Sequence, residues 1–174
     1  MLAGNDAYIP SSFESIATLS PTSGTSVTFS SIPNTYKSLQ LRILAFGNSS
    51  SNNIQFNGDT GNNYANHRLY GDGFSTSATG FANQPNIRIN AYSSAVIATY
   101  PTVEIIDIID YASTNKTKTV RIFSGMDANQ TSGSDIILAS GLWNSTAAIS
   151  SLTINIVTGS FPSGTKFALY GIKG

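Results

Sequence analysis

The residues in this chain that could do chemistry are one histidine and a small number of carboxylates. His67 is the only histidine, and with a serine and an aspartate it could complete a Ser-His-Asp catalytic arrangement. No serine has the G-x-S-x-G spacing that presents a nucleophile on a tight turn. Asp107 and Asp110 are three residues apart in one apolar strand, so they point to opposite faces and form no pair of catalytic carboxylates. The sequence therefore predicts no catalytic residues and no enzyme, with His67 in a structural position on the surface or on a strand.

Two glycine-rich segments resemble calcium-binding loops, NGDTGNN at 57–63 and GDG at 71–73. Calcium takes about six to eight oxygen ligands, several of them carboxylates, and each of these segments has a single aspartate. Neither segment has the lysine of a phosphate-binding loop or a dinucleotide fingerprint. The chain has no cysteine, which excludes disulfides and thiolate metal sites. We therefore expect two tight turns, no metal and no cofactor.

The composition narrows the choice of partners. Only 10% of the 174 residues are charged, and the nine basic residues are scattered, which argues against a nucleic-acid partner because phosphate binding needs clustered positive charge. No run approaches the ~18 apolar residues of a membrane helix, and the first ten residues lack the features of a signal peptide. The length suits one domain.

The elements that must position these residues are short strands. The segments SLQLRILAF at 38–46 and SLTINIV at 151–157 alternate apolar and polar residues with the period of a half-buried strand. About ten such segments follow one another with Gly, Asn, Ser or Pro between them, and none has the 3.6-residue period of a helix. The pattern predicts an all-β protein, an antiparallel β-sandwich of the jelly-roll kind.

Several local expectations follow from the same pattern. Residues 13–19 and 26–32 flank a turn and are predicted to form a hairpin, whereas 74–85 is predicted to be the longest irregular stretch. The segment TVEIIDIIDY at 102–111 is apolar on both faces, which suits a central strand covered on both sides. Alternatively, one face can serve the core and the other a neighbouring subunit. The three strands of 135–174 are expected to form the densest part of the core.

Four sequence blocks occur in a fixed order: FNGDTGNNY at 56–64, DYASTNK at 110–116, GLWNSTAAISS at 141–151 and FALYGI at 167–172. Together they resemble a widespread group of bacteriophage virion proteins, and the resemblance extends over about residues 13–174. It implies an all-β module on the surface of a virion, either a capsid decoration protein or part of a tail or fibre.

The resemblance leaves two functions open. The first is a capsid decoration (cement) protein, located on the capsid surface and present as a homotrimer, which clamps the major capsid protein. The second is a host-recognition module of the tail that binds surface glycans through loops at 45–53, 71–85 and 126–134. In that interpretation four aromatic residues could stack on sugar rings: Tyr64, Tyr70, Tyr92 and Trp143. The position of Trp143 at a strand end also suits a core or rim residue.

The chain is predicted to divide into an arm, residues 1–12, and a single β-sandwich domain, residues 13–174. The arm lies outside the strand pattern but carries Leu2, Tyr8 and Ile9, which a merely solvated tail would lack. We expect these three residues to contact a neighbour in the assembled particle.

Overall fold

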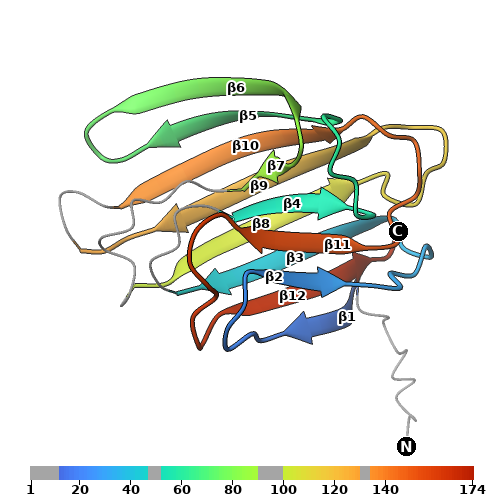
Figure 1. Cartoon of the computed structure of the whole chain (residues 1–174), viewed down its shortest axis with the longest axis horizontal. Coiled ribbons are helices and arrows are strands. Elements are labelled where there is room, and N and C mark those ends of the chain that lie inside the picture. The colour runs from blue at the N-terminus through green and yellow to red at the C-terminus, as the bar shows by residue number, and fades with distance from the viewer. Residues whose placement is uncertain (1–11, 47–51, 90–99, 130–133) are drawn as a thin grey trace, which may run out of the picture.

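The computed structural model describes residues 12–46, 52–89, 100–129 and 134–174. They form two antiparallel sheets that pack face to face (Figure 1). In order of pairing, the large sheet contains β1 (Phe13–Leu19), β12 (Lys166–Ile172), β3 (Ser38–Ala45), β8 (Thr102–Ile109), β9 (Lys118–Met126), β10 (Asp135–Trp143), β5 (Tyr64–Gly71) and β6 (Thr76–Gln84). The small sheet contains β2 (Ser26–Phe29), β11 (Leu152–Ile156), β4 (Asn52–Phe56) and β7 (Ile87–Arg88).

The predicted all-β sandwich is confirmed, and eight of its strands have the pairing order of a jelly roll. When β5, β6, β9 and β10 are left out, the eight remaining strands can be counted from first to eighth along the chain. In the large sheet they then pair in the order first, eighth, third and sixth, which are β1, β12, β3 and β8. In the other sheet they pair as second, seventh, fourth and fifth. Successive strands of the N-terminal part therefore alternate between the two sheets.

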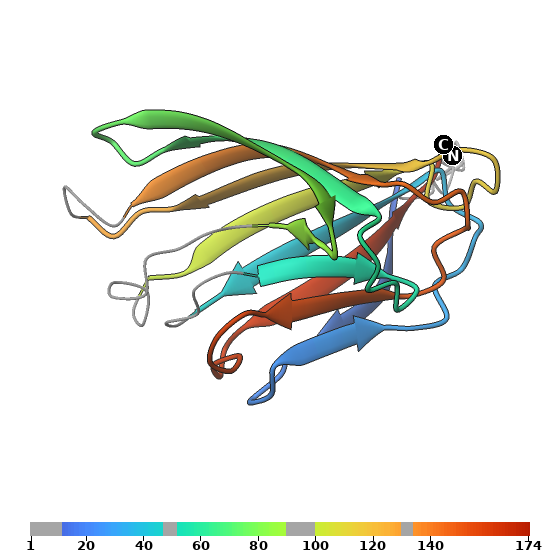
Figure 2. The same ribbon diagram turned by 45° about the horizontal axis from the view of Figure 1, so that its top comes forward.

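The four remaining strands are two inserted hairpins. The hairpin β9–β10 follows β8 and extends the large sheet, and the hairpin β5–β6 pairs with the free edge of β10. The end of β6 leads through Pro85 and Asn86 into β7, so the chain passes from the large sheet to the edge of the small one (Figure 2). The insertions thus make the large sheet twice as wide as the small one.

The core lies between the sheets because alternate residues of each strand point inward. Leu39, Leu41 and Ile43 of β3 are buried, as the alternation in SLQLRILAF predicts. Ile154 of β11 and Phe56 of β4 face them from the small sheet and are fully buried. Each large aliphatic side chain buried in this way contributes ~1.5–3 kcal/mol, and a slip of one residue would turn the whole set to solvent.

Two local predictions are wrong. The strands β1 and β2 do not form a hairpin, because β1 pairs with β12 in the large sheet and β2 pairs with β11 in the small one. Most of the stretch 74–85, predicted to be irregular, forms β6. Its residues are mostly exposed or half-buried because β6 is an edge strand, so its sequence has no need of apolar alternation.

Some predictions fall on residues that the structure does not describe. Leu2, Tyr8, Ile9 and Tyr92 lie outside the described residues. Within the described ranges there is no helix long and apolar enough to cross a membrane.

Candidate functional site

The block FNGDTGNNY forms a tight turn between β4 and β5. Asn57 and Gly58 both have positive φ, 53° and 68°, a conformation that asparagine and glycine tolerate best. The Asp59 carboxylate accepts hydrogen bonds from Trp143 Nε1 at 2.7 Å, from Gly61 N at 2.8 Å and from Asn63 Nδ2. The Trp143 bond is the main reason why the pKa of Asp59 lies below its ordinary value. Both carboxylate oxygens already accept bonds from the protein, so Asp59 acts as a structural residue of the turn.

Two of the aromatic residues considered for sugar stacking are core residues. Tyr64 and Trp143 are 1% and 3% exposed, and their rings stack with centroids 6.3 Å apart. The Tyr64 hydroxyl accepts a hydrogen bond from Phe56 N at 3.0 Å, and burial raises the pKa of Tyr64 to about 12. The prediction that these rings are available to a ligand is wrong, because the sandwich needs them between its sheets. Tyr70 is half-buried.

The block DYASTNK and the adjoining strand β9 are held by buried polar bonds. The Tyr111 hydroxyl donates to Pro33 O at 2.6 Å and accepts from Tyr36 N at 3.1 Å. Lys118 has a fully buried side chain, and its ammonium donates to three backbone carbonyls. These are Ser113 O at 2.7 Å, Lys116 O at 2.6 Å and Thr146 O at 3.1 Å.

The last two blocks complete the same framework. In GLWNSTAAISS, Ser150 N and Ser151 N donate to Asn57 Oδ1 at 2.9 and 3.1 Å, which ties the segment after β10 to the β4–β5 turn. In FALYGI, a Cβ on Gly171 would collide with the ring of Tyr36, which lies flat against this glycine. The four blocks therefore hold strands and their connections together within the framework of the sandwich.

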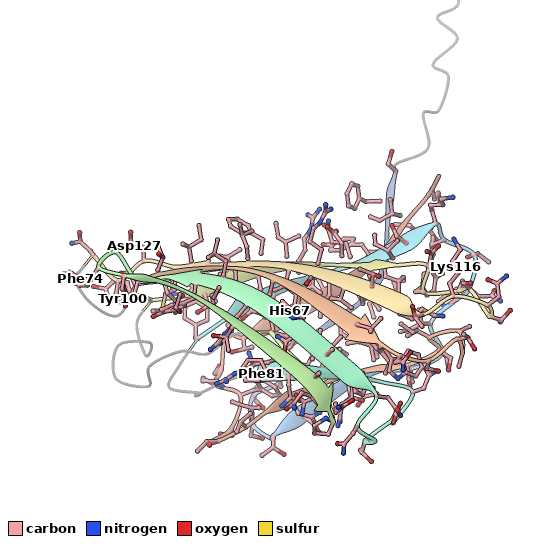
Figure 3. All side chains as sticks on the ribbon, turned by 90° about the horizontal axis from the view of Figure 1, so that it is seen from above. His67, Phe74, Phe81, Tyr100, Lys116 and Asp127 are labelled. Atoms are coloured by element: carbon pink, nitrogen blue, oxygen red, sulfur yellow. The ribbon has the colours of Figure 1, made fainter. Side chains whose placement is uncertain are left out.

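The single histidine and the carboxylates do not come together. His67 lies on the outer face of β5, and its imidazole covers Gly80 of β6 (Figure 3). In the cross-strand register Ser140 and Arg121 lie between His67 and Asp107. At a strand spacing of ~4.8 Å, this places His67 and Asp107 roughly 14 Å apart. Asp110 forms an ion pair with Lys116 at 3.3 Å, and Lys116 lies at the far end of the molecule from Phe74 and Asp127 (Figure 3).

A different surface stands out, the outer face of the large sheet. Ile109 of β8 is exposed there but lies beyond Asp107. Six further large apolar side chains are 38–53% exposed and lie together on four neighbouring strands. We call this set the apolar face: Val103 and Ile105 of β8, Phe123 of β9, Ile136 and Leu138 of β10, and Leu69 of β5.

The register makes the apolar face continuous. Ile105 is opposite Phe123, Phe123 is opposite Leu138, and Leu138 is opposite Leu69. One unbroken row of apolar side chains therefore crosses four strands. Val103 and Ile136 form a second row on either side of Gly125. Directly opposed side chains have Cβ atoms ~4.5–5.5 Å apart, so neighbours in the first row are in lateral contact. In the second row Gly125 leaves a gap between Val103 and Ile136.

A polar row borders the apolar face, and its charges are paired within the protein. Arg121 donates to Asp107 Oδ2 at 2.7 Å, and Gln40 Nε2 donates to Asp107 Oδ1 at 2.9 Å. A shallow hollow of about 510 Å³ lies along this border, where Leu69, Leu138 and the small Ala78 form its apolar part. An apolar centre, a hollow and a polar margin are the features of a protein-binding surface.

The two-sided apolar pattern of 102–111 anticipated one strand of this surface. Thr102, Glu104, Ile106 and Ile108 of β8 are buried, whereas Val103, Ile105 and Ile109 are exposed. The contributions of β9, β10 and β5 were missed, because a single outward apolar residue on a strand is unremarkable until the strand order places it beside the others.

Comparison with protein families, with curated proteins and with solved structures found no match for this chain. In the part of the chain that the structure describes, no three His, Asp or Glu residues form a group that could hold a metal ion.

Proposed function

We propose that this chain is a structural protein of a bacteriophage virion, a decoration protein that binds the major capsid protein and assembles as a homotrimer through its apolar face. The observation that carries the proposal is the continuous apolar row from Ile105 to Leu69 on the outer face of the large sheet. The four sequence blocks, which resemble virion proteins, support the virion as its location.

The position of the apolar face suits contacts between copies. It extends from β8 across the inserted hairpin β9–β10 to β5, beyond the eight jelly-roll strands that enclose the core. A cyclic trimer can bring the same face of three copies to one axis, so that each face is covered by two neighbours. The paired charges of Asp107 and Arg121 then fall at the margin, where polar groups stay hydrated.

The energetics favour an assembly with many simultaneous contacts. Covering the exposed half of each of the six side chains contributes on the order of 1 kcal/mol apiece. Association itself costs ~4–15 kcal/mol. The apolar contact of one face is therefore barely enough to hold a dimer together. In a closed ring each copy contacts two neighbours, and attachment of the ring to the capsid shell adds further contacts, so the assembly as a whole is held more tightly than any one pair.

Attachment to the major capsid protein is assigned to the arm, residues 1–12, through Leu2, Tyr8 and Ile9. The arm then binds the major capsid protein and the apolar face binds other copies of the chain, so the two contacts can be tested separately.

Light scattering on the isolated protein tests the trimer. We expect three copies per particle in solution for the unchanged chain, and monomers for the double variant Phe123→Glu, Leu138→Glu, which places charge at the centre of the apolar face. Val157→Glu is the matched control, because Val157 is equally exposed but follows β11 of the small sheet. A strict monomer at high concentration for the unchanged chain would overturn the trimer.

Copy number tests the decoration role. Gel densitometry of purified virions, with the major capsid protein as the internal standard, should show the chain in amounts comparable with that protein. A handful of copies per virion would instead indicate a tail component.

A further inference from the structure

A second surface lies where β6 leaves the large sheet and enters β7. A groove of about 300 Å³ is found at this seam. It is built from residues of both sheets and of the connection between them: Asn53 of β4, Asn66 of β5, Phe81 and Gln84 of β6, Asn86, Arg88 of β7, and Val157. Figure 3 shows Phe81 on the side of β6 that faces the small sheet.

The polar lining consists mainly of amide side chains. Asn53 and Asn86 are half-buried, and neither side chain makes a hydrogen bond to another residue in the described ranges. Gln84 donates from Nε2 to Ala82 O at 2.8 Å, which leaves its carbonyl oxygen as an acceptor. An amide group carries two donors and an acceptor in one plane, whereas a carboxylate only accepts and an ammonium or guanidinium only donates.

The apolar lining consists of Phe81 and Val157. The Phe81 ring is held in place by the Arg68 guanidinium, whose carbon lies 5.9 Å from the ring centroid. Val157 is 60% exposed although it follows a core strand directly. A ligand in the groove would therefore contact the Phe81 ring and the Val157 side chain, together with amide groups that can still form hydrogen bonds.

This combination matches the chemistry of a sugar ring. Each sugar hydroxyl both donates and accepts, which amides satisfy in pairs, and the C–H face of the ring packs on an aromatic side chain. Among the described residues no carboxylate lines the groove, so this lining lacks the carboxylate ligands of a cation site. Its volume is at the lower end of ligand pockets, which suits one or two sugar units.

We propose that the groove between β6 and β7 binds a saccharide unit, with Asn53 and Asn86 as the hydroxyl-binding residues and Phe81 as the stacking surface. The site does not depend on the proposed trimer. Asn66 and Phe81 are opposite each other on the inner face of β5–β6, whereas Leu69 and His67 face outward. The groove and the apolar face thus lie on opposite sides of the same hairpin and can be occupied together.

Saturation-transfer NMR on the full chain tests the site with free glucose, galactose, N-acetylglucosamine, rhamnose and galacturonic acid as probes. We expect transfer to at least one of these sugars, and galacturonic acid reports whether a carboxylate on the ring strengthens binding beside Arg88. In the double variant Asn53→Ala, Asn86→Ala, we expect affinity to fall at least about tenfold, because two hydrogen bonds of ~1 kcal/mol are lost. Asn62→Ala, at an exposed turn asparagine outside the groove, should bind like the unchanged chain.

A second variant tests the groove in case the double variant Asn53→Ala, Asn86→Ala does not fold. Val157→Arg fills the groove from an exposed position without touching the core, and it should abolish transfer while the dispersed amide spectrum stays intact. Absence of transfer from every probe sugar to the unchanged chain would overturn the proposal. Equal transfer in the unchanged chain and in Val157→Arg would also overturn it. Neither outcome bears on the trimer, which light scattering measures separately.

Discussion

Among single residues, Lys118 joins three backbone carbonyls through one buried side chain. Lys118→Met keeps most of the apolar stem but leaves these carbonyls without their donor. We expect the free energy of unfolding to fall by about 2–4 kcal/mol in chemical denaturation. Lys116→Met, which removes an exposed ion pair with Asp110, should change it by less than about 1 kcal/mol. Equal effects of the two substitutions would contradict the structural role of Lys118.

Asp135 gives the molecule a pH dependence at the residue scale. Burial raises the pKa of its carboxyl to about 6, above the ordinary value of ~3.9. Between these two values the folded state binds more protons than the unfolded state, so stability rises as the pH falls through this window and is lowest above pH 6. Asp135→Asn should therefore unfold at a higher temperature at pH 7.5, and this advantage should disappear near pH 4. A gain that is the same at both pH values would count against burial of the charged form as its cause.

At the scale of elements, β12 shows how a strand depends on one glycine. Tyr36 lies flat against Gly171 and also donates from its hydroxyl to Glu14 Oε1 at 3.0 Å. Gly171→Ala would push this ring away, and we expect a loss of about 1–3 kcal/mol in denaturation, as for other overpacked sites. Gly125→Ala in β9 is the control, because a Cβ there meets only Asp135 O at 3.7 Å. If Gly125→Ala destabilised the protein as much as Gly171→Ala, crowding by Tyr36 would not be the cause.

For the whole molecule, we predict that the arm serves assembly and is not needed for folding. Removal of residues 1–11 retains Ser12, whose carbonyl accepts a hydrogen bond from Lys173 N at 2.9 Å. We expect the melting temperature of the isolated protein to stay unchanged and its occupancy on virions to be lost. Burial of three apolar side chains cannot offset the ordering of about a dozen residues, at ~1–2 kcal/mol each, without backbone bonds to a neighbour. Unchanged occupancy would show that the arm plays no part in attachment.

The amino-acid sequence determined the class of the fold and most of the strand positions. Period-two alternation over 38–46 and 151–157 is enough to assign strands, because the side-chain direction in a strand depends only on parity. The same rule predicted that β8 has two apolar faces with one of them in the core, and the described residues of β8 alternate between buried and more exposed positions. That the exposed face meets a partner stays a prediction.

Tertiary structure decided what lies beside what. Sequence proximity suggested that β1 and β2 pair, but each joins a C-terminal strand in a different sheet, because burial of both inner faces outweighs local hairpin formation. The strand β6 shows no alternation of apolar and polar residues from which it could have been predicted. As an edge strand it is held by backbone hydrogen bonds rather than by buried side chains. The row from Ile105 to Leu69 and the groove between Asn53 and Phe81 join residues from distant strands. Both surfaces come into existence only when the sheet order is set, because no local pattern carries information on which strands become neighbours.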